Sequence, residues 1–134
     1  MTIAVVGAGR MGRGLAHVFA YAGHRVSLID LKDRPPADAE RVLAEAAAEV
    51  ERTLGLMGSF GQVDPSTAEE IASRIDYVGM GGAPAALATA DVVFEGVPEV
   101  LDAKREAFAA ICQHAGEDAV IASTTRGSTG VDAA

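Results

Sequence analysis

The chain has 134 residues, 49% of them hydrophobic, which is enough for a single domain with its own core. The net charge at pH 7 is −8, and Lys and Arg never occur in runs longer than two. Nucleic-acid binding needs a basic surface, so these values argue against a nucleic-acid partner.

Cysteine content and hydropathy indicate the cellular compartment that we expect. Cys112 is the single cysteine, so no internal disulfide can form, and its helical context predicts a small buried side chain rather than a nucleophile. No apolar run approaches the roughly 18 residues of a membrane span, and the first residues show no basic leader. We therefore expect a cytoplasmic location and no membrane partner.

The first thirty residues follow a strand–turn–helix–strand order. Residues 2–6 are a short apolar run, and Gly7-Ala8-Gly9-Arg10-Met11-Gly12 follows at once. A helix is predicted from Arg10 to about Ala22, then a strand over 25–29 that ends at Asp30. This is the G-x-G-x-x-G fingerprint of dinucleotide-binding proteins, in the structural context that the fingerprint requires.

Each glycine of the fingerprint has a separate physical role. Gly7 permits the tight turn, Gly9 lets the backbone approach a pyrophosphate, and Gly12 lets the helix lie close to the sheet. Asp30 would accept a hydrogen bond from a ribose 2′-hydroxyl and repel a 2′-phosphate, which favours NAD over NADP, although Lys32 argues mildly against this. The alternative is a glycine turn that binds no ligand.

The segment after Asp30 predicts two helices rather than one. The first begins near Pro36 and spans some twenty residues, until Gly58-Ser59-Phe60-Gly61 ends it. Asp64-Pro65 then predicts the N-cap and first residue of a second helix that ends near Ser73. The pattern indicates a helical hairpin inserted after the second strand.

The remaining residues alternate between strands and helices. Strands are predicted over 75–78, 91–95 and 119–122, with one helical turn over 85–88 and a helix over 99–113. This order predicts an α/β, Rossmann-type, doubly wound and mainly parallel sheet. Ligands bind such sheets at the carboxyl ends of the strands. His17 and His24 are expected to be solvated.

The chain resembles one dehydrogenase family, most specifically in its second half. Residues 90–99 read Ala-Asp-Val-Val-Phe-Glu-Gly-Val-Pro-Glu, with Lys104 five residues further on, and Ile121-Ala122-Ser123-Thr124-Thr125 follows later. Together with the form of the glycine turn and the long hairpin, this sequence is similar to the NAD-binding domain of 3-hydroxyacyl-CoA dehydrogenases. The resemblance covers residues 1–125.

The resemblance implies roles for particular residues, with NAD as the cofactor. The pyrophosphate would lie against the glycine turn, formed by Gly7, Gly9, Arg10, Met11 and Gly12. Asp30 would hold the adenosine ribose, and Glu99 and Lys104 match the pair near the nicotinamide. From the residues alone, Glu99 and Lys104 would be a capping acid and a surface lysine. No metal site is predicted.

The sequence departs from the family pattern near its end. Family members use a His–Glu pair as general base, and that His lies beyond the serine–threonine motif. No catalytic residue is therefore predicted in this chain. His114 lies near the end of the helix predicted over 99–113, before that motif, and is not taken as the base. Arg126 stands where the family has a serine. We expect residues 126–134 to be a tail foreign to the family, with the C-terminal helical domain absent.

These features predict an NAD-dependent dehydrogenase that oxidises a 3-hydroxyl to a ketone. The expected substrate is a 3-hydroxyacyl-CoA of the 3-hydroxybutyryl-CoA type. However, residues 53–62 carry no cation for the CoA phosphates, so carnitine or gulonate dehydrogenases and the non-catalytic lambda-crystallins are alternatives. This chain alone is expected to bind cofactor without turnover, and a homo-oligomer is an additional prediction.

Overall fold

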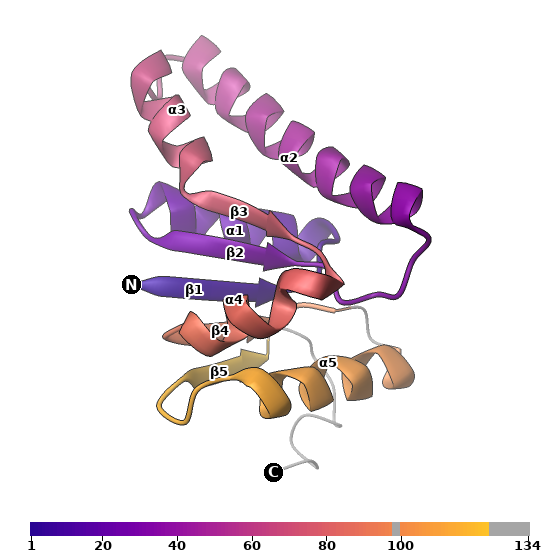
Figure 1. Cartoon of the computed structure of the whole chain (residues 1–134). Coiled ribbons are helices and arrows are strands. Elements are labelled where there is room, and N and C mark those ends of the chain that lie inside the picture. The colour runs from indigo at the N-terminus through magenta and orange to yellow at the C-terminus, as the bar shows by residue number, and fades with distance from the viewer. Residues whose placement is uncertain (98–99, 124–134) are drawn as a thin grey trace.

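The computed structural model describes residues 1–97 and 100–123 and contains a five-stranded parallel sheet (Figure 1). The strand order is β3-β2-β1-β4-β5, and every neighbouring pair is parallel. The strands are β1 (Thr2–Val6), β2 (Arg25–Ile29), β3 (Ile75–Val78), β4 (Val92–Glu95) and β5 (Val120–Ser123). All carboxyl ends therefore lie at one edge, and the strand order reverses between β1 and β4, where such sheets bind ligands.

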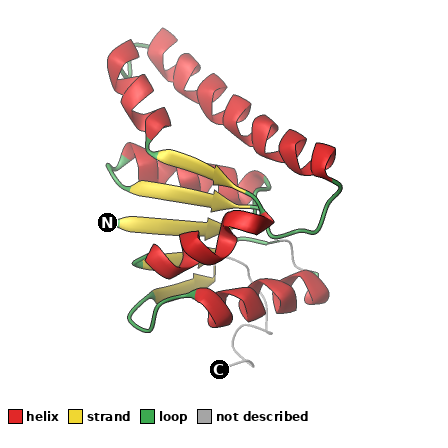
Figure 2. Cartoon of the chain, in the orientation of Figure 1, coloured by secondary structure: helices red, strands yellow, loops and turns green. Residues whose placement is uncertain are grey.

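Helices cover both faces of the sheet (Figure 2). They are α1 (Arg10–Tyr21), α2 (Pro36–Ser59), α3 (Pro65–Ser73), α4 (Ala83–Thr89) and α5 (Leu101–His114), with a short 3₁₀ helix, η1 (Met80–Gly82). Alternate residues of β1 enter different cores: Ile3 and Val5 pack with α1, α2 and α3, and Ala4 and Val6 pack with α4 and α5. Because β1 is buried on both faces, its sequence is a continuous apolar run. The predicted doubly wound fold is confirmed.

The insertion after β2 is the helical hairpin that the sequence predicts. Helix α2 has 24 residues, or about 36 Å at 1.5 Å per residue, and α3 runs back beside it (Figure 1). Ala46, Val50 and Leu54 repeat every fourth residue and form the buried stripe of α2. Ile71 of α3 completes this packing. Within the described residues, no helix is long and apolar enough to cross a bilayer.

Element boundaries agree with prediction to within a few residues, and two local predictions are wrong. Helix α4 spans residues 83–89, more than the one predicted turn, because Ala83 and Leu87 are both buried against the second core. Cys112 is exposed rather than buried. The buried face of α5 is formed by Lys104, Ala107 and Ile111, and a residue directly after Ile111 is rotated off that face.

Candidate cofactor-binding site

The turn between β1 and α1 is fixed by backbone contacts that only glycine permits. Gly7 has a φ of +113°, and a Cβ there would lie 3.0 Å from the carbonyl carbon and oxygen of Gly96 after β4. A Cβ on Gly12 would overlap the carbonyl oxygen of Gly7. The turn is also tied to both neighbouring strands, because Gly7 N–H donates to Ile29 at 2.8 Å and Gly96 N–H donates to Val6 at 2.9 Å.

Gly9 lies in the same turn but has different surroundings. Its φ of −80° is open to any residue, and a Cβ built there would meet no heavy atom within 4 Å. Gly9 is the N-cap of α1 and offers no side-chain cap, so the first N–H groups of the helix have no partner within it. Exposed N–H groups at the positive end of a helix dipole bind phosphate, so these residues fit the pyrophosphate of a dinucleotide.

The remaining residues of the turn lie at the start of α1. Arg10 and Met11 are both exposed in the first helical turn, and Met11 leaves 55% of its surface accessible. Both therefore lie beside the open space at Gly9. Their contact with a cofactor is a prediction from the resemblance.

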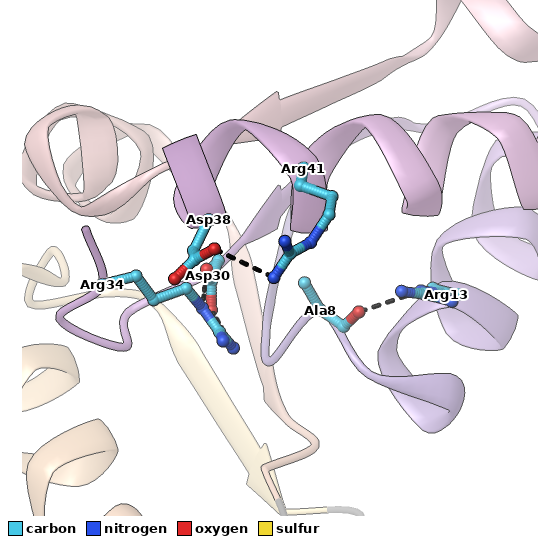
Figure 3. Close-up of polar contacts among 6 residues, drawn as sticks. All are labelled: Ala8, Arg13, Asp30, Arg34, Asp38 and Arg41. Atoms are coloured by element: carbon cyan, nitrogen blue, oxygen red, sulfur yellow. Dashed lines mark hydrogen bonds and ion pairs between the residues drawn. The ribbon is translucent and has the colours of Figure 1, made fainter. Parts of the chain in front are cut away.

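Asp30 lies at the carboxyl end of β2, as predicted, but its carboxylate already has a partner (Figure 3). Arg34 Nε lies 2.8 Å from Oδ2, and Arg34 Nη2 lies 3.5 Å from Oδ1. The Asp30 side chain is only 8% exposed, and its backbone N–H donates to Val78 of β3 at 2.8 Å. Lys32 is the cation that the sequence predicts near Asp30, whereas the structure pairs the acid with Arg34.

Arg13 links the glycine turn to the helical hairpin, a role that the sequence does not predict. Its Nε donates to the carbonyl oxygen of Ala8 at 3.0 Å, and Figure 3 shows this contact. Its Nη1 lies 2.8 Å from Glu49 Oε2 on α2. The spacing of Arg13 and Glu49, 36 residues apart, gives no local signal from which this contact could be predicted.

Glu95 is the second missed residue at the carboxyl edge. Its side chain is fully buried at the end of β4, and Oε2 accepts a hydrogen bond from Val97 N–H at 2.9 Å. Oε1 accepts one from Ser123 Oγ of β5 at 3.1 Å. An acid that ends a buried apolar strand is the signal that could have identified it, because buried carboxylates must be hydrogen-bonded.

The predicted pair near the nicotinamide is only partly described. Glu99 lies outside the described residues, as do Thr124, Thr125 and the expected tail over 126–134. Lys104 is 5% exposed and shares the inner face of α5 with Ala107 and Ile111, so it is no surface lysine. A lysine is seldom buried to this extent, which makes Lys104 a notable group beside the carboxyl edge.

The three histidines have no carboxylate partner within the described part of the chain. Among the described residues, which include all three histidines, no histidine lies within 4.0 Å of a carboxylate. His17 is half-buried rather than solvated: its Nδ1 has no hydrogen-bond partner there, and burial lowers the pKa of its imidazole. A small cavity of about 220 Å³ beside it is lined by Arg10, Arg13 and Glu49.

The fold and the turn define a dinucleotide-binding domain of the doubly wound class. The family model for the NAD-binding domain of 3-hydroxyacyl-CoA dehydrogenase matches residues 2–129, and the chain belongs to this family. NAD is the cofactor of these domains, and the predicted family and cofactor are confirmed.

Individual relatives agree with this assignment. The chain is 36% identical to a lambda-crystallin homolog of Bos taurus over 92% of the chain, and 32% identical to an L-carnitine dehydrogenase/betainyl-CoA thioesterase of Agrobacterium fabrum over 95%. The crystal structure of 3-hydroxybutyryl-CoA dehydrogenase from Escherichia coli K12 superposes with a TM-score of 0.79 at 30% identity, over 93% of the chain. The chain spans 36%, 24% and 24% of the lengths of these three proteins.

Proposed function

We propose that this chain holds the NAD of a dehydrogenase that oxidises a 3-hydroxyl group to a ketone. The observation that carries the proposal is the empty space at Gly9, beside a helix start that has no side-chain cap. Gly7 and Gly12 are held by protein contacts, whereas no described atom explains a glycine at position 9. A bound pyrophosphate explains it, because a side chain there would block its approach.

In this proposal the residues of the chain bind and orient the cofactor. The N–H groups of the first turn of α1, from Arg10 to Gly12, would bind the pyrophosphate, and Asp30 would accept a hydrogen bond from the adenosine ribose. Glu99 and Lys104 are proposed to lie on the nicotinamide side. NAD supplies the hydride acceptor when bound.

The proposed substrate is a 3-hydroxyacyl-CoA, and a free hydroxy acid is a second candidate. The 3-hydroxyacyl-CoA is supported by the family and by the fold shared with 3-hydroxybutyryl-CoA dehydrogenase. The free hydroxy acid is favoured by the end of α2, where residues 53–59 carry no cation that could bind the CoA phosphates. The similarity to an L-carnitine dehydrogenase is consistent with that candidate.

The proposal predicts that the 134-residue chain binds NADH and has negligible turnover. None of its histidines lies against a carboxylate in the described structure, and losing a general base costs about 10²–10⁴-fold in rate. Fluorescence titration with NADH, followed by an assay with 3-hydroxybutyryl-CoA and with carnitine, tests both parts. The absence of saturable NADH binding would overturn the proposal. Turnover within about tenfold of a full-length relative would contradict the prediction of negligible turnover.

A further inference from the structure

Arg34 is the cation in direct contact with the acid proposed to hold the ribose. Its guanidinium approaches both oxygens of the Asp30 carboxylate, at 2.8 Å and 3.5 Å. The Arg34 side chain is 26% exposed and Asp30 is 8% exposed, so the pair lies partly beneath the surface. Ion pairs with this degree of burial are screened less by water and salt than fully exposed ones.

The backbone on both sides holds this pair in place. Asp30 N–H is bonded to Val78 of β3, and Pro35-Pro36 follow Arg34 directly and begin α2. Proline fixes its own φ and restricts the residue before it to extended conformations. Arg34 is therefore held at the carboxyl edge of the sheet beside Asp30, and its position does not depend on a long mobile loop.

A second arginine nearby provides an internal comparison. Figure 3 shows Asp38 and Arg41 beside Asp30 and Arg34 at the start of α2. Arg41 Nη2 lies 3.0 Å from Asp38 Oδ1, but the Arg41 side chain is 64% exposed. Both arginines carry one positive charge in the same region, and Arg34 is the one paired with the proposed ribose ligand.

The pairing with Arg34 changes how strongly the Asp30 carboxylate can exclude the 2′-phosphate of NADPH. An unpaired carboxylate at the ribose accepts a hydrogen bond from a 2′-hydroxyl and repels a 2′-phosphate. A guanidinium on the same carboxylate offsets its charge, and its planar set of N–H donors is well suited to a phosphate. Arg34 thus weakens the repulsion and supplies a donor group where the additional phosphate of NADPH would lie.

We propose that Arg34 is a specificity-determining residue that lets this site accept NADPH as well as NADH, with NADH retaining only a modest preference. The inference rests on the proposed function, because it assumes that the ribose lies at Asp30. It concerns the ratio of the two dissociation constants and not the affinity for NADH alone.

The test is a calorimetric titration of the wild-type chain and of Arg34→Gln with NADH and with NADPH. We expect the preference of the wild type for NADH to be below about tenfold, and Arg34→Gln to increase it by about tenfold, as expected for loss of one charge-assisted contact. Arg34→Lys keeps the charge without the planar fork and should give an intermediate ratio. Arg41→Gln removes an equal charge nearby and should change the ratio by less than about threefold.

The outcomes separate this inference from the function on which it rests. If the wild type binds NADH but Arg34→Gln and Arg34→Lys leave the ratio unchanged, the inference is overturned and the proposed function stands. An equal change of the ratio in Arg41→Gln would also overturn the inference, because the effect would then come from the overall positive charge of the region and not from Arg34 itself. If the wild type binds neither nucleotide, both proposals are overturned. Circular dichroism confirms that each variant is folded, and Arg34→Lys serves if Arg34→Gln is not.

Discussion

Two loops at the same edge of the sheet are built on different physical principles. The turn after β1 is determined by backbone sterics, because Gly7 and Gly12 leave no room for a Cβ. The loop after β2 is determined by side-chain charge, because Arg34 folds back onto Asp30 at 2.8 Å. The first arrangement tolerates no side chain at Gly7 or Gly12, whereas the second permits substitutions that alter specificity. The difference suggests that binding of a dinucleotide depends on the turn and the choice between dinucleotides depends on the loop.

The largest expected effect concerns the sterics of the turn. Gly12→Ala would force a Cβ against the Gly7 carbonyl oxygen, and we expect a loss of about 3 kcal/mol or more in the free energy of unfolding. Urea denaturation measures this loss. Gly55→Ala, in an exposed part of α2 with no atom within 4 Å, is the control and should gain about 0.5–1 kcal/mol. Equal urea midpoints for Gly12→Ala and the wild type would refute the steric account of the turn.

The next effect tests the loop after β2. Asp30→Asn keeps the shape of the side chain but removes its charge, so the neighbouring Arg34 would face the ribose without a balancing carboxylate. We expect NADH to bind about tenfold more weakly and NADPH more tightly. Titration of both nucleotides by fluorescence measures the change. A parallel weakening of both nucleotides would show that Asp30 supports the loop and does not select the cofactor.

A smaller effect is expected where the glycine turn is linked to the hairpin through Arg13. Arg13→Gln removes the contacts with Ala8 and Glu49, so the turn would be held less firmly to α2. We expect about a threefold weaker affinity for NADH and about 1 kcal/mol lower stability. Arg25→Gln breaks the exposed pair with Asp76, 3.6 Å away, and is the matched control. Equal affinities for NADH in the two variants would contradict the proposed link.

The smallest effect is a pH dependence at His17 of α1. Burial lowers the pKa of its imidazole, so the folded chain binds a proton less readily than the unfolded chain. The folded state is therefore fully stable above the ordinary histidine pKa of about 6.5 and loses stability as the pH falls below it. Arg10, Arg13 and Glu49 line the adjoining cavity.

The variant His17→Gln removes this titration. Urea midpoints measured at about pH 8 and about pH 5.5 should differ less in His17→Gln than in the wild type. Comparing this difference in midpoint between the two proteins isolates His17, because the other titrating groups are present in both. An equal difference between the two pH values in wild type and His17→Gln would contradict the lowered pKa of the His17 imidazole.

The fold and the turn could be predicted from the sequence because their causes are local. Apolar runs, glycine spacing and Pro36 or Pro65 at helix starts act within a few residues, and β1, α2, α3 and β3 lie close to their predicted bounds. The contacts of Glu95 and Arg13 could not be predicted, because they join residues brought together only by the fold. Cys112 was misplaced because helical context predicts a helix but leaves its rotation about the axis undetermined.

The central claim is that the empty space at Gly9 is the place of a pyrophosphate, and one measurement tests it directly. Gly9→Ala adds a Cβ that no described atom opposes, so its free energy of unfolding in urea should stay within about 1 kcal/mol of the wild type. Titration with NADH should nevertheless show at least about tenfold weaker binding, while Gly55→Ala binds normally. Wild-type affinity for NADH in Gly9→Ala would contradict the claim.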